Sequence, residues 1–259
     1  MTVEREPLSA PPGARTGEWP GARPGAGPGA LTAAEVDHLV VAAATLEEGV
    51  AWCEATLGVV PGPGGRHALF GTHNRLSKIE GDRYPSTYLE IIAIDSEAEP
   101  PAWPRWFGLD EQGVQHELAA RGPRLWHVVA RTRSLEAHLA RLVAAGVDAG
   151  EAMAASRRTP TGELRWRIAV RPDGRLPYRG ALPTLIEWGS EHPTRAMPAS
   201  PLRLAGLTLA GVPLPAASAL ALQGVSFVAN SGPERGTQAA PALRAVLETP
   251  RGPVTLESA

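Results

Sequence analysis

Four residues able to bind a metal each lie inside a short apolar segment of the sequence. They are His38, Glu90, His127 and Glu187. Such segments are typical of buried strands, where an unpaired carboxylate is costly. Two imidazoles and two carboxylates suit a divalent first-row metal such as Zn, Ni, Mn or Fe, with the remaining positions open to water or substrate oxygens. The order His, Glu, His, Glu therefore predicts a shared metal or substrate site. The alternative is that each residue is an ordinary core or surface residue.

The two histidines open units that repeat one pattern. Seven residues after each histidine comes a candidate N-cap, Thr45 in the first unit and Ser134 in the second, and Leu-Glu follows both. The two predicted helices then place their apolar residues at matching offsets: Leu46, Val50, Cys53 and Leu57, and Leu135, Leu139, Leu142 and Gly146. Because a glutamate in an apolar strand closes both units, the sequence indicates a hidden repeat of about 90 residues.

The fold class that this pattern predicts is α+β, with paired βαβββ modules and a third α+β unit at the C-terminus. Strands are expected at 36–41, 67–70, 76–79 and 88–94 in the first module and at 125–130, 164–170 and 182–188 in the second. Between them, 95–124 is rich in Pro and Trp and reads as a packed crossover with a short helix near 114–120. Its tryptophans are expected to cover a sheet edge or the mouth of a cleft.

The domain boundaries follow from composition and from the repeat. Residues 1–33 are rich in Pro and Gly and poor in large apolar side chains, so a disordered tail is expected. The first module with its connector takes 34–115 and the second module takes 116–195. Residues 196–259 give the order β, α, β, β, β again but lack a histidine in the first strand. This unit is either a degenerate copy or a small α+β cap.

Composition excludes several classes of partner. The formal charge is −2, and basic residues are spread along the chain, so neither DNA nor RNA is expected to bind. The sequence has no apolar run of about 20 residues and no signal-peptide pattern, so no membrane partner and a cytoplasmic location are expected. The single cysteine, Cys53, falls on the buried face of a predicted helix, which favours a core role over reactivity. The expected assembly is a monomer or a homodimer.

Several motifs resemble one known family. The stretches Asp37–Val41, Gly71–Leu76, Tyr88–Ile92 and Ile186–Trp188 are similar to glyoxalase-like domain proteins of the vicinal oxygen chelate superfamily. The resemblance implies paired βαβββ modules over about 34–190. In the glyoxalase I branch the metal ligands come from the first and last strands of both modules, which implies His38, Glu90, His127 and Glu187 here.

The resemblance also implies a reaction class. A metal would chelate two neighbouring oxygens of a small metabolite as a Lewis acid, and Glu187 would shuttle a proton as the catalytic residue of a lyase or isomerase. The long connector and the third unit are absent from a minimal glyoxalase I, which argues against glutathione-type substrates. Four ligands spread over two modules argue against the oxygen chemistry of the ring-cleaving dioxygenases.

A polar segment offers groups that could hold the substrate. We expect substrate contacts from Trp188 and from four consecutive residues: Thr72, His73, Asn74 and Arg75. The alternative for the four is a polar turn.

Two other functions stay open. One is a metal-free protein that binds or sequesters an antibiotic or another aromatic ligand between tryptophans, with Trp103, Trp106, Trp126, Trp166 and Trp188 as candidate walls. The other is an interaction module whose site has decayed.

Overall fold

The computed structural model of the chain describes residues 33–159, 162–229 and 241–258. The predicted tail therefore lies outside the described residues apart from Ala33. The first module consists of β1 (Glu35–Ala42), α1 (Leu46–Leu57), β2 (Gly62–His67), β3 (Thr72–Lys78) and β4 (Tyr88–Ile94). The connector carries a short helical turn (Trp106–Gly108) and α2 (Gln112–Arg121). The second module consists of β5 (Arg124–Arg131), α3 (Leu135–Ala144), β6 (Glu151–Thr159), β7 (Gly162–Val170), a turn (Pro177–Gly180) and β8 (Thr184–Trp188).

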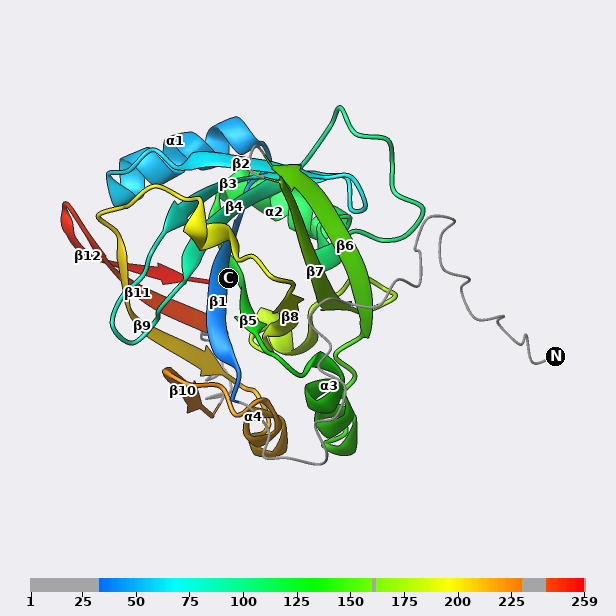
Figure 1. Ribbon diagram of the computed structural model, residues 1–259. Helices are drawn as coiled ribbons and strands as arrows, with labels where there is room; N and C mark the ends of the chain where they lie inside the picture. The colour runs from blue at the N-terminus through cyan, green and yellow to red at the C-terminus, as the bar shows by residue number, and fades with distance from the viewer. Residues whose placement is uncertain (1–32, 160–161, 230–240, 259) are drawn as a thin grey trace.

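The two modules share one eight-stranded sheet with the strand order β2-β3-β4-β1-β5-β8-β7-β6. Within each module the first strand pairs in parallel with the last, β1 with β4 and β5 with β8. The modules join through the antiparallel pair β1 and β5 at the centre of the sheet (Figure 1). The predicted fold of paired βαβββ modules is confirmed.

The sheet has two faces that bury different cores. One face, which we call the helix face, packs Leu39 and Ile91 with the apolar residues of α1 and α3. The other, which we call the connector face, packs Val40 and Ile92 with Trp106 and other connector residues. The side chains of a strand alternate between the faces, so strand position decides which residues can meet. The connector, whose tryptophans were expected to cover a sheet edge or the mouth of a cleft, thus packs on one face of the sheet through Trp106.

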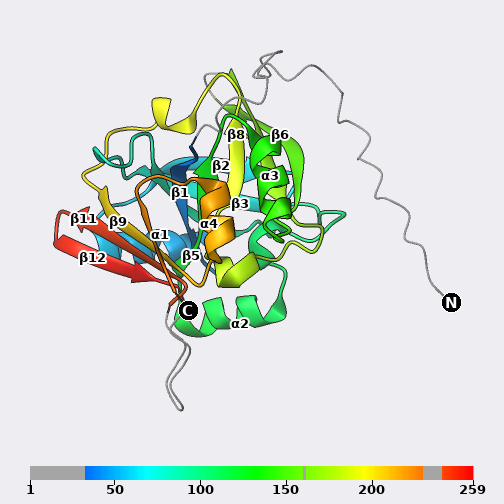
Figure 2. The ribbon, with the colours of Figure 1, turned by 90° about the horizontal axis from the view of Figure 1, so that it is seen from below.

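The C-terminal unit adds a separate four-stranded sheet. It consists of β9 (Arg203–Ala210), α4 (Leu214–Leu220), β10 (Val225–Val228), β11 (Leu243–Thr249) and β12 (Gly252–Glu257), in the strand order β10-β9-β11-β12. Its first strand lies inside its sheet between β10 and β11, whereas β1 pairs with the last strand of its module. The element order is thus shared with the modules, but the strand pairing is different. The unit joins the core of the helix face, and α4 packs beside α3 (Figures 1 and 2).

Some predicted elements differ from the observed ones. The segment expected as a loop before His67 is strand β2, and Thr72–Arg75 open strand β3 instead of forming a turn. Strand β6 was not expected, because its polar and small side chains lie at the edge of the sheet, where no strong apolar alternation is needed. Among the described residues, no helix combines the length and the apolar composition needed to cross a membrane.

Candidate functional site

A β-bulge brings two adjacent residues of β1 to one face. The register between β1 and β5 shifts between Val36 and His38, so Asp37 is the extra residue, and a bulge of this kind re-aims a side chain. Asp37 Oδ1 lies 2.6 Å from His38 Nδ1. Its other carboxylate oxygen accepts from Trp188 Nε1 at 2.9 Å and lies 3.0 Å from His192 Nε2. Asp37 therefore joins the start of the first module to the end of the second.

His38 lies between two carboxylates in the interior. Its Nε2 is 3.4 Å from Glu90 Oε2, on the side opposite Asp37. Its ring stacks on Tyr88 with centroids 4.5 Å apart. His38 and Glu90 are each only 4% exposed and Asp37 is fully buried. Burial of three ionisable groups is tolerated only when they are paired and hydrogen-bonded, as they are here.

The contacts fix the charge of each group. Burial by itself would lower the pKa of His38, but the hydrogen bonds to Asp37 and Glu90 outweigh burial and raise it to about 9. Burial would raise the pKa of Glu90, but the contacts from His38, His67 and Asn74 lower it to about 2. The pKa of Asp37 lies well below its usual range, because the hydrogen bonds from His192 and His38 outweigh its burial. At neutral pH the cluster is an imidazolium between two carboxylates.

The hydrogen-bonded chain continues beyond Glu90 through β3 and β2. Asn74 Nδ2 donates to Glu90 Oε1 at 2.5 Å and lies 3.3 Å from His67 Nε2. His67 Nδ1 is 3.0 Å from Thr72 Oγ1. Burial lowers the pKa of His67 to about 4, so its ring is neutral near pH 7. We call the whole set the His38 cluster: Asp37, His38, His67, Thr72, Asn74, Tyr88, Glu90, Trp188 and His192.

Trp106 of the connector covers the cluster on the connector face of the sheet. Its ring lies edge-on to His67 with centroids 4.9 Å apart and stacks on Phe70 at 4.0 Å. Trp106 is 4% exposed, and within the described part of the chain its Nε1 has no hydrogen-bond partner. An unpaired buried donor costs about 1–3 kcal/mol. It marks a position where an oxygen atom of a small molecule or water would be stabilised.

Arg157 of β6 adds a positive charge beside the cluster. Its charge adds to the effect of burial in lowering the pKa of His67, and it opposes the effect of burial on Tyr88. The guanidinium packs over Gly65, where an added Cβ would come within 2.2 Å of Arg157 Nη1. Among the residues that the structure describes, no hydrogen bond or ion pair engages this half-buried guanidinium. It is thus available to hold an anionic group.

His127 does not join the cluster as a ligand. Its Nδ1 lies 2.8 Å from the carbonyl oxygen of Gly180, so Nδ1 carries the hydrogen. Its Nε2 accepts from the backbone N–H of Thr184 at 3.2 Å and lies 2.9 Å from Thr184 Oγ1. Burial lowers the pKa of His127 to about 3. Both ring nitrogens of the neutral imidazole already have partners, so neither points a lone pair at His38.

Glu187 lies on the other face of the sheet. Ile186 of β8 packs in the core of the connector face, and Trp188 packs against that core, so the residue between them points to the helix face. There the Glu187 carboxylate pairs with Arg167, which also donates to Glu136 of α3 at 2.8 Å. The structure therefore does not bring the predicted catalytic carboxylate to His38 and Glu90.

The predicted substrate-binding segment is divided between the same two faces. Asn74 pairs with Ile92 and shares the connector face with Thr72, so both reach the cluster. His73 and Arg75 alternate with them and point to the helix face, and Arg75 is exposed. A run of four residues in a strand cannot all line one site. Trp188 does contact the cluster, through Asp37.

The donor set does not fit the predicted four-ligand metal site. Of the four residues, only His38 and Glu90 lie together. Across 33–159, 162–229 and 241–258, no three His, Cys, Asp or Glu side chains are arranged to hold a metal ion. We therefore derive no chemical step through a metal.

Several members of the cluster were not predicted from the sequence. They are Asp37, His67, Tyr88, His192 and, beside the cluster, Arg157. Trp106 was named only as a candidate wall of a site for aromatic ligands. Asp37 had a usable signal, because a carboxylate between Val36 and His38 in a buried strand needs a partner. The other residues depend on contacts between distant segments, such as that of His192 with Asp37, and the sequence carries no local signal for those.

Comparisons with known proteins identify a family for this chain. A family model described as a glyoxalase-like domain matches residues 36–224. A comparison with curated proteins gives no match.

Three solved structures are similar at low identity. A hypothetical protein from Staphylococcus aureus has a TM-score of 0.47 at 13% identity, covering 69% of this chain and 70% of that one. Methylmalonyl-CoA epimerase from Mycobacterium tuberculosis has a TM-score of 0.37 at 17% identity, covering 64% and 93%. The epimerase of Streptomyces coelicolor in complex with 2-nitronate-propionyl-CoA has a TM-score of 0.39 at 18% identity, covering 62% and 99%.

Proposed function

The chain belongs to the glyoxalase-like domain family of the vicinal oxygen chelate superfamily, and from this premise we propose that it is a lyase or isomerase that moves a proton on a small oxygenated metabolite. One observation carries the proposal, namely that buried His38 lies between two carboxylates, with Nδ1 2.6 Å from Asp37 and Nε2 3.4 Å from Glu90. These contacts raise the pKa of His38 to about 9. Neighbouring groups whose environments push their pKa values apart are typical of acid and base pairs.

The two groups have complementary roles in the proposed reaction. The Glu90 carboxylate removes a proton from a carbon next to a carbonyl or carboxylate, and the C–H electron pair forms an enolate. His38 donates from Nε2 to the developing oxyanion. Asp37 holds Nδ1 and keeps the ring charged. Return of the proton to carbon gives the isomer, and loss of a leaving group from the neighbouring carbon gives the lyase product.

Two groups beside the cluster favour an anionic substrate rich in oxygen. The Arg157 guanidinium offers a fixed positive charge for a carboxylate. The unpaired Nε1 of Trp106 offers a donor to a substrate oxygen. The substrate class that these groups favour is a small 2-oxo or 2-hydroxy acid.

Substrate entry requires the connector to move in this proposal. Trp106 and Phe107 are buried against the connector face, and the cluster beneath them is closed. Phe107 has a φ of 62°, a left-handed conformation that strains a bulky residue by about 1–3 kcal/mol. The next residue, Gly108, also has a positive φ, of 68°. This pair is the hinge at which we expect the connector to open.

The test is solvent deuterium exchange followed by NMR. The protein is incubated in D2O with 2-oxobutyrate or L-lactate, which carry a C–H beside a carbonyl and beside a carboxylate. We expect deuterium incorporation by the native chain and loss of about 100-fold or more in Glu90→Gln and His38→Gln. Glu187→Gln is the matched control, because it changes a carboxylate on the other face.

The outcomes separate the candidate functions. Exchange that survives Glu90→Gln, or that is lost in Glu187→Gln instead, would contradict the assigned roles. Absence of exchange with both acids would count against the reaction class, and binding of either acid without exchange would favour the sequestering function. Repeating the assay after treatment with a chelator, with measurement of bound metal, tests whether exchange depends on a metal.

A further inference from the structure

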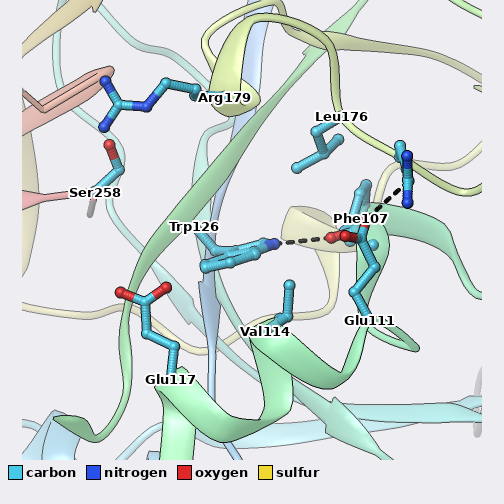
Figure 3. Close-up of a pocket in the computed structure, with 10 residues that line it drawn as sticks. Phe107, Glu111, Val114, Glu117, Trp126, Leu176, Arg179 and Ser258 are labelled. Carbon is cyan, nitrogen blue, oxygen red and sulfur yellow. Dashed lines mark hydrogen bonds and ion pairs between the residues drawn. The ribbon is translucent and has the colours of Figure 1, made fainter. Parts of the chain in front are cut away.

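A cavity outside the His38 cluster lies where three parts of the chain meet. It has a volume of about 350 Å3 and is lined by residues of the connector, the second module and the C-terminal unit (Figure 3). Cavities of about 300–1,000 Å3 are typical of small-molecule sites. We propose that it is a regulatory site, at which an uncharged planar aromatic compound with a hydrogen-bond acceptor binds and holds the connector closed over the His38 cluster.

The walls of the cavity are apolar and one of them is flat. Trp126 lies along it, and its Nε1 donates to the carbonyl oxygen of Phe107 at 2.8 Å, which fixes the indole plane. Phe107, Val114 of α2 and Leu176 complete the apolar lining. Aromatic rings pack favourably on a fixed indole. The walls therefore favour a planar ring over a flexible chain.

The charged residues that line the cavity already have partners. Glu111 Oε1 lies 3.2 Å from Arg175 Nε, and Glu117 accepts from Arg124 at 2.8 Å. The remaining charged residue of the lining, Arg179, is engaged in an interaction of its own. A charged ligand would thus lose hydration without gaining an ion pair. The lining therefore favours an uncharged ligand.

Ser258 offers the ligand one hydrogen-bond donor. Its backbone N–H donates to the carbonyl oxygen of Leu243 at 3.0 Å, and its Oγ accepts from the backbone N–H of Leu243 at 3.0 Å, so the position of Ser258 beside β11 is fixed. No other bond of this hydroxyl is found among the described residues, so its hydrogen is available. An acceptor atom on the aromatic ligand would satisfy it.

Phe107 connects the cavity to the His38 cluster. Its ring stacks on Trp106 with centroids 5.1 Å apart, and Trp106 in turn lies against His67 of the cluster. The next residue, Gly108, donates its backbone N–H to the carbonyl oxygen of Gly174 at 2.7 Å. The cavity wall therefore includes the hinge at which we expect the connector to open.

A ligand in the cavity would bind the closed connector in preference to the open one. Opening at Phe107 and Gly108 would pull the Phe107 wall away from Trp126 and would break the bond to Gly174. The ligand would then lose a wall, and a ligand that binds one state better shifts the equilibrium towards that state. This regulatory role rests on the proposed function, because the connector covers the groups assigned to the reaction.

The first experiment measures binding of two uncharged probes of matched shape, quinoline and naphthalene, by equilibrium dialysis at pH 8. Quinoline carries a ring nitrogen that accepts a hydrogen bond and naphthalene does not. We expect quinoline to bind the full chain about fivefold more tightly. Ser258→Ala should remove this difference and leave the affinity for naphthalene within about twofold, and Ser96→Ala, at an exposed serine of a turn, is the control.

A second variant blocks the cavity itself. Val114→Phe fills it from α2 and should abolish binding of both probes. Val143→Phe is the matched control, because Val143 of α3 is 67% exposed and lies outside the cavity. Thermal melting confirms that each variant is folded. His38→Gln should leave the affinity for quinoline within about twofold, which separates this site from the His38 cluster.

The second experiment measures closure of the connector by amide hydrogen exchange with mass spectrometry over residues 103–111, where the Gly108 N–H reports the bond to Gly174. Quinoline at ten times its Kd should slow this exchange about tenfold, since it binds the closed state. It should slow deuterium incorporation into 2-oxobutyrate by a similar factor, and neither effect should occur in Val114→Phe.

The two readouts separate failure of the regulatory site from failure of the proposed reaction. If the chain does not exchange 2-oxobutyrate, dialysis and amide exchange still test the site. Absence of quinoline binding, equal affinity for quinoline and naphthalene, unchanged binding in folded Val114→Phe, or binding without slower amide exchange over 103–111 would overturn the proposal.

Discussion

The charge on His38 makes the stability of the protein depend on pH. The pKa of His38 is raised from 6.5 to about 9 in the folded state, so its stabilisation is fully present below pH 6.5 and is lost as the pH rises through 9. The loss is on the order of 3 kcal/mol. Several groups act on the acid side, among them Asp37, Glu90, His67 and His127. The pKa of Glu90 is lowered to about 2, so its stabilisation is lost as the pH falls below 4.5. His67, with a pKa lowered to about 4, destabilises the fold below pH 6.5. We expect maximum stability near pH 6.5.

Urea unfolding between pH 3 and pH 10 checks this profile. His38→Gln should flatten the alkaline limb between pH 6.5 and 9, while the acid limb keeps the contribution of His67. Glu191→Gln, which removes an exposed carboxylate outside the His38 cluster, serves as the control. If the native protein and His38→Gln lose stability equally above pH 6.5, the ion pairs of His38 are not the cause.

The sequence identified a site residue correctly only where it gave both the right strand and the right face of that strand. His38 and Glu90 were found because a charged group in an apolar strand needs a partner, and the repeat identified the strands. Glu187 met the same criterion, yet its position in β8 places it on the helix face, paired with Arg167. Neighbouring residues of a strand point to opposite faces, and the apolar pattern around Glu187 does not specify which face of β8 this residue takes.

At the scale of the elements, the caps of the two equivalent helices differ. Thr45 Oγ1 accepts from the backbone N–H of Glu48 at 3.2 Å, whereas the side chain of Ser134 makes no cap hydrogen bond. Thr45→Ala should therefore lower the free energy of unfolding by about 1 kcal/mol, and Ser134→Ala by much less. Chemical denaturation of the two variants side by side measures the difference. Equal losses would show that the two caps are equivalent in solution.

Replacing a glycine by alanine should have opposite effects on stability in β2 and in α2. A Cβ on Gly64 would come within 2.1 Å of the Asn74 backbone oxygen, whereas a Cβ on Gly113 would meet nothing within 4 Å. Gly64→Ala should thus destabilise the protein by about 1–3 kcal/mol or more. Gly113→Ala, in an exposed helical position, should stabilise it by about 0.5–1 kcal/mol. Thermal melts of both variants test this pair, and a neutral Gly64→Ala would contradict the close approach of β2 to β3.

The sequence predicted strands β2 and β6 least well, because neither has an apolar pattern of its own. β2 contains four consecutive residues of Gly or Pro, Gly62–Gly65, which locally favour a loop, and it forms a strand because glycine allows the backbone to approach Asn74 closely. β6 lies at the sheet edge and carries mostly small and polar side chains. In contrast, β1, β4 and β5 combine apolar runs with burial at the centre of the sheet, so local pattern and tertiary position agree.

At the scale of the molecule, the order of elements did not determine how the strands pair. All three units follow β, α, β, β, β, and the repeat predicted the pairing of the two modules. In the C-terminal unit β9 pairs in parallel with β10, the next strand along the chain. In the modules the first strand pairs with the last. The same sequence pattern is compatible with both strand arrangements, because either one buries the apolar face of a small sheet.

The C-terminal unit shares one core with the paired modules, and this predicts a single unfolding transition. Leu247 of β11 is fully buried in the core of the helix face, and Leu→Ala at such a position costs about 2–5 kcal/mol. Every tryptophan of the chain precedes residue 189, so tryptophan fluorescence reports on the modules and not on the unit that is mutated. If the core is one cooperative unit, Leu247→Ala shifts the fluorescence transition in urea as far as it shifts the circular dichroism transition. A fluorescence midpoint that stays in place while an early circular dichroism transition emerges would show that the C-terminal unit unfolds independently.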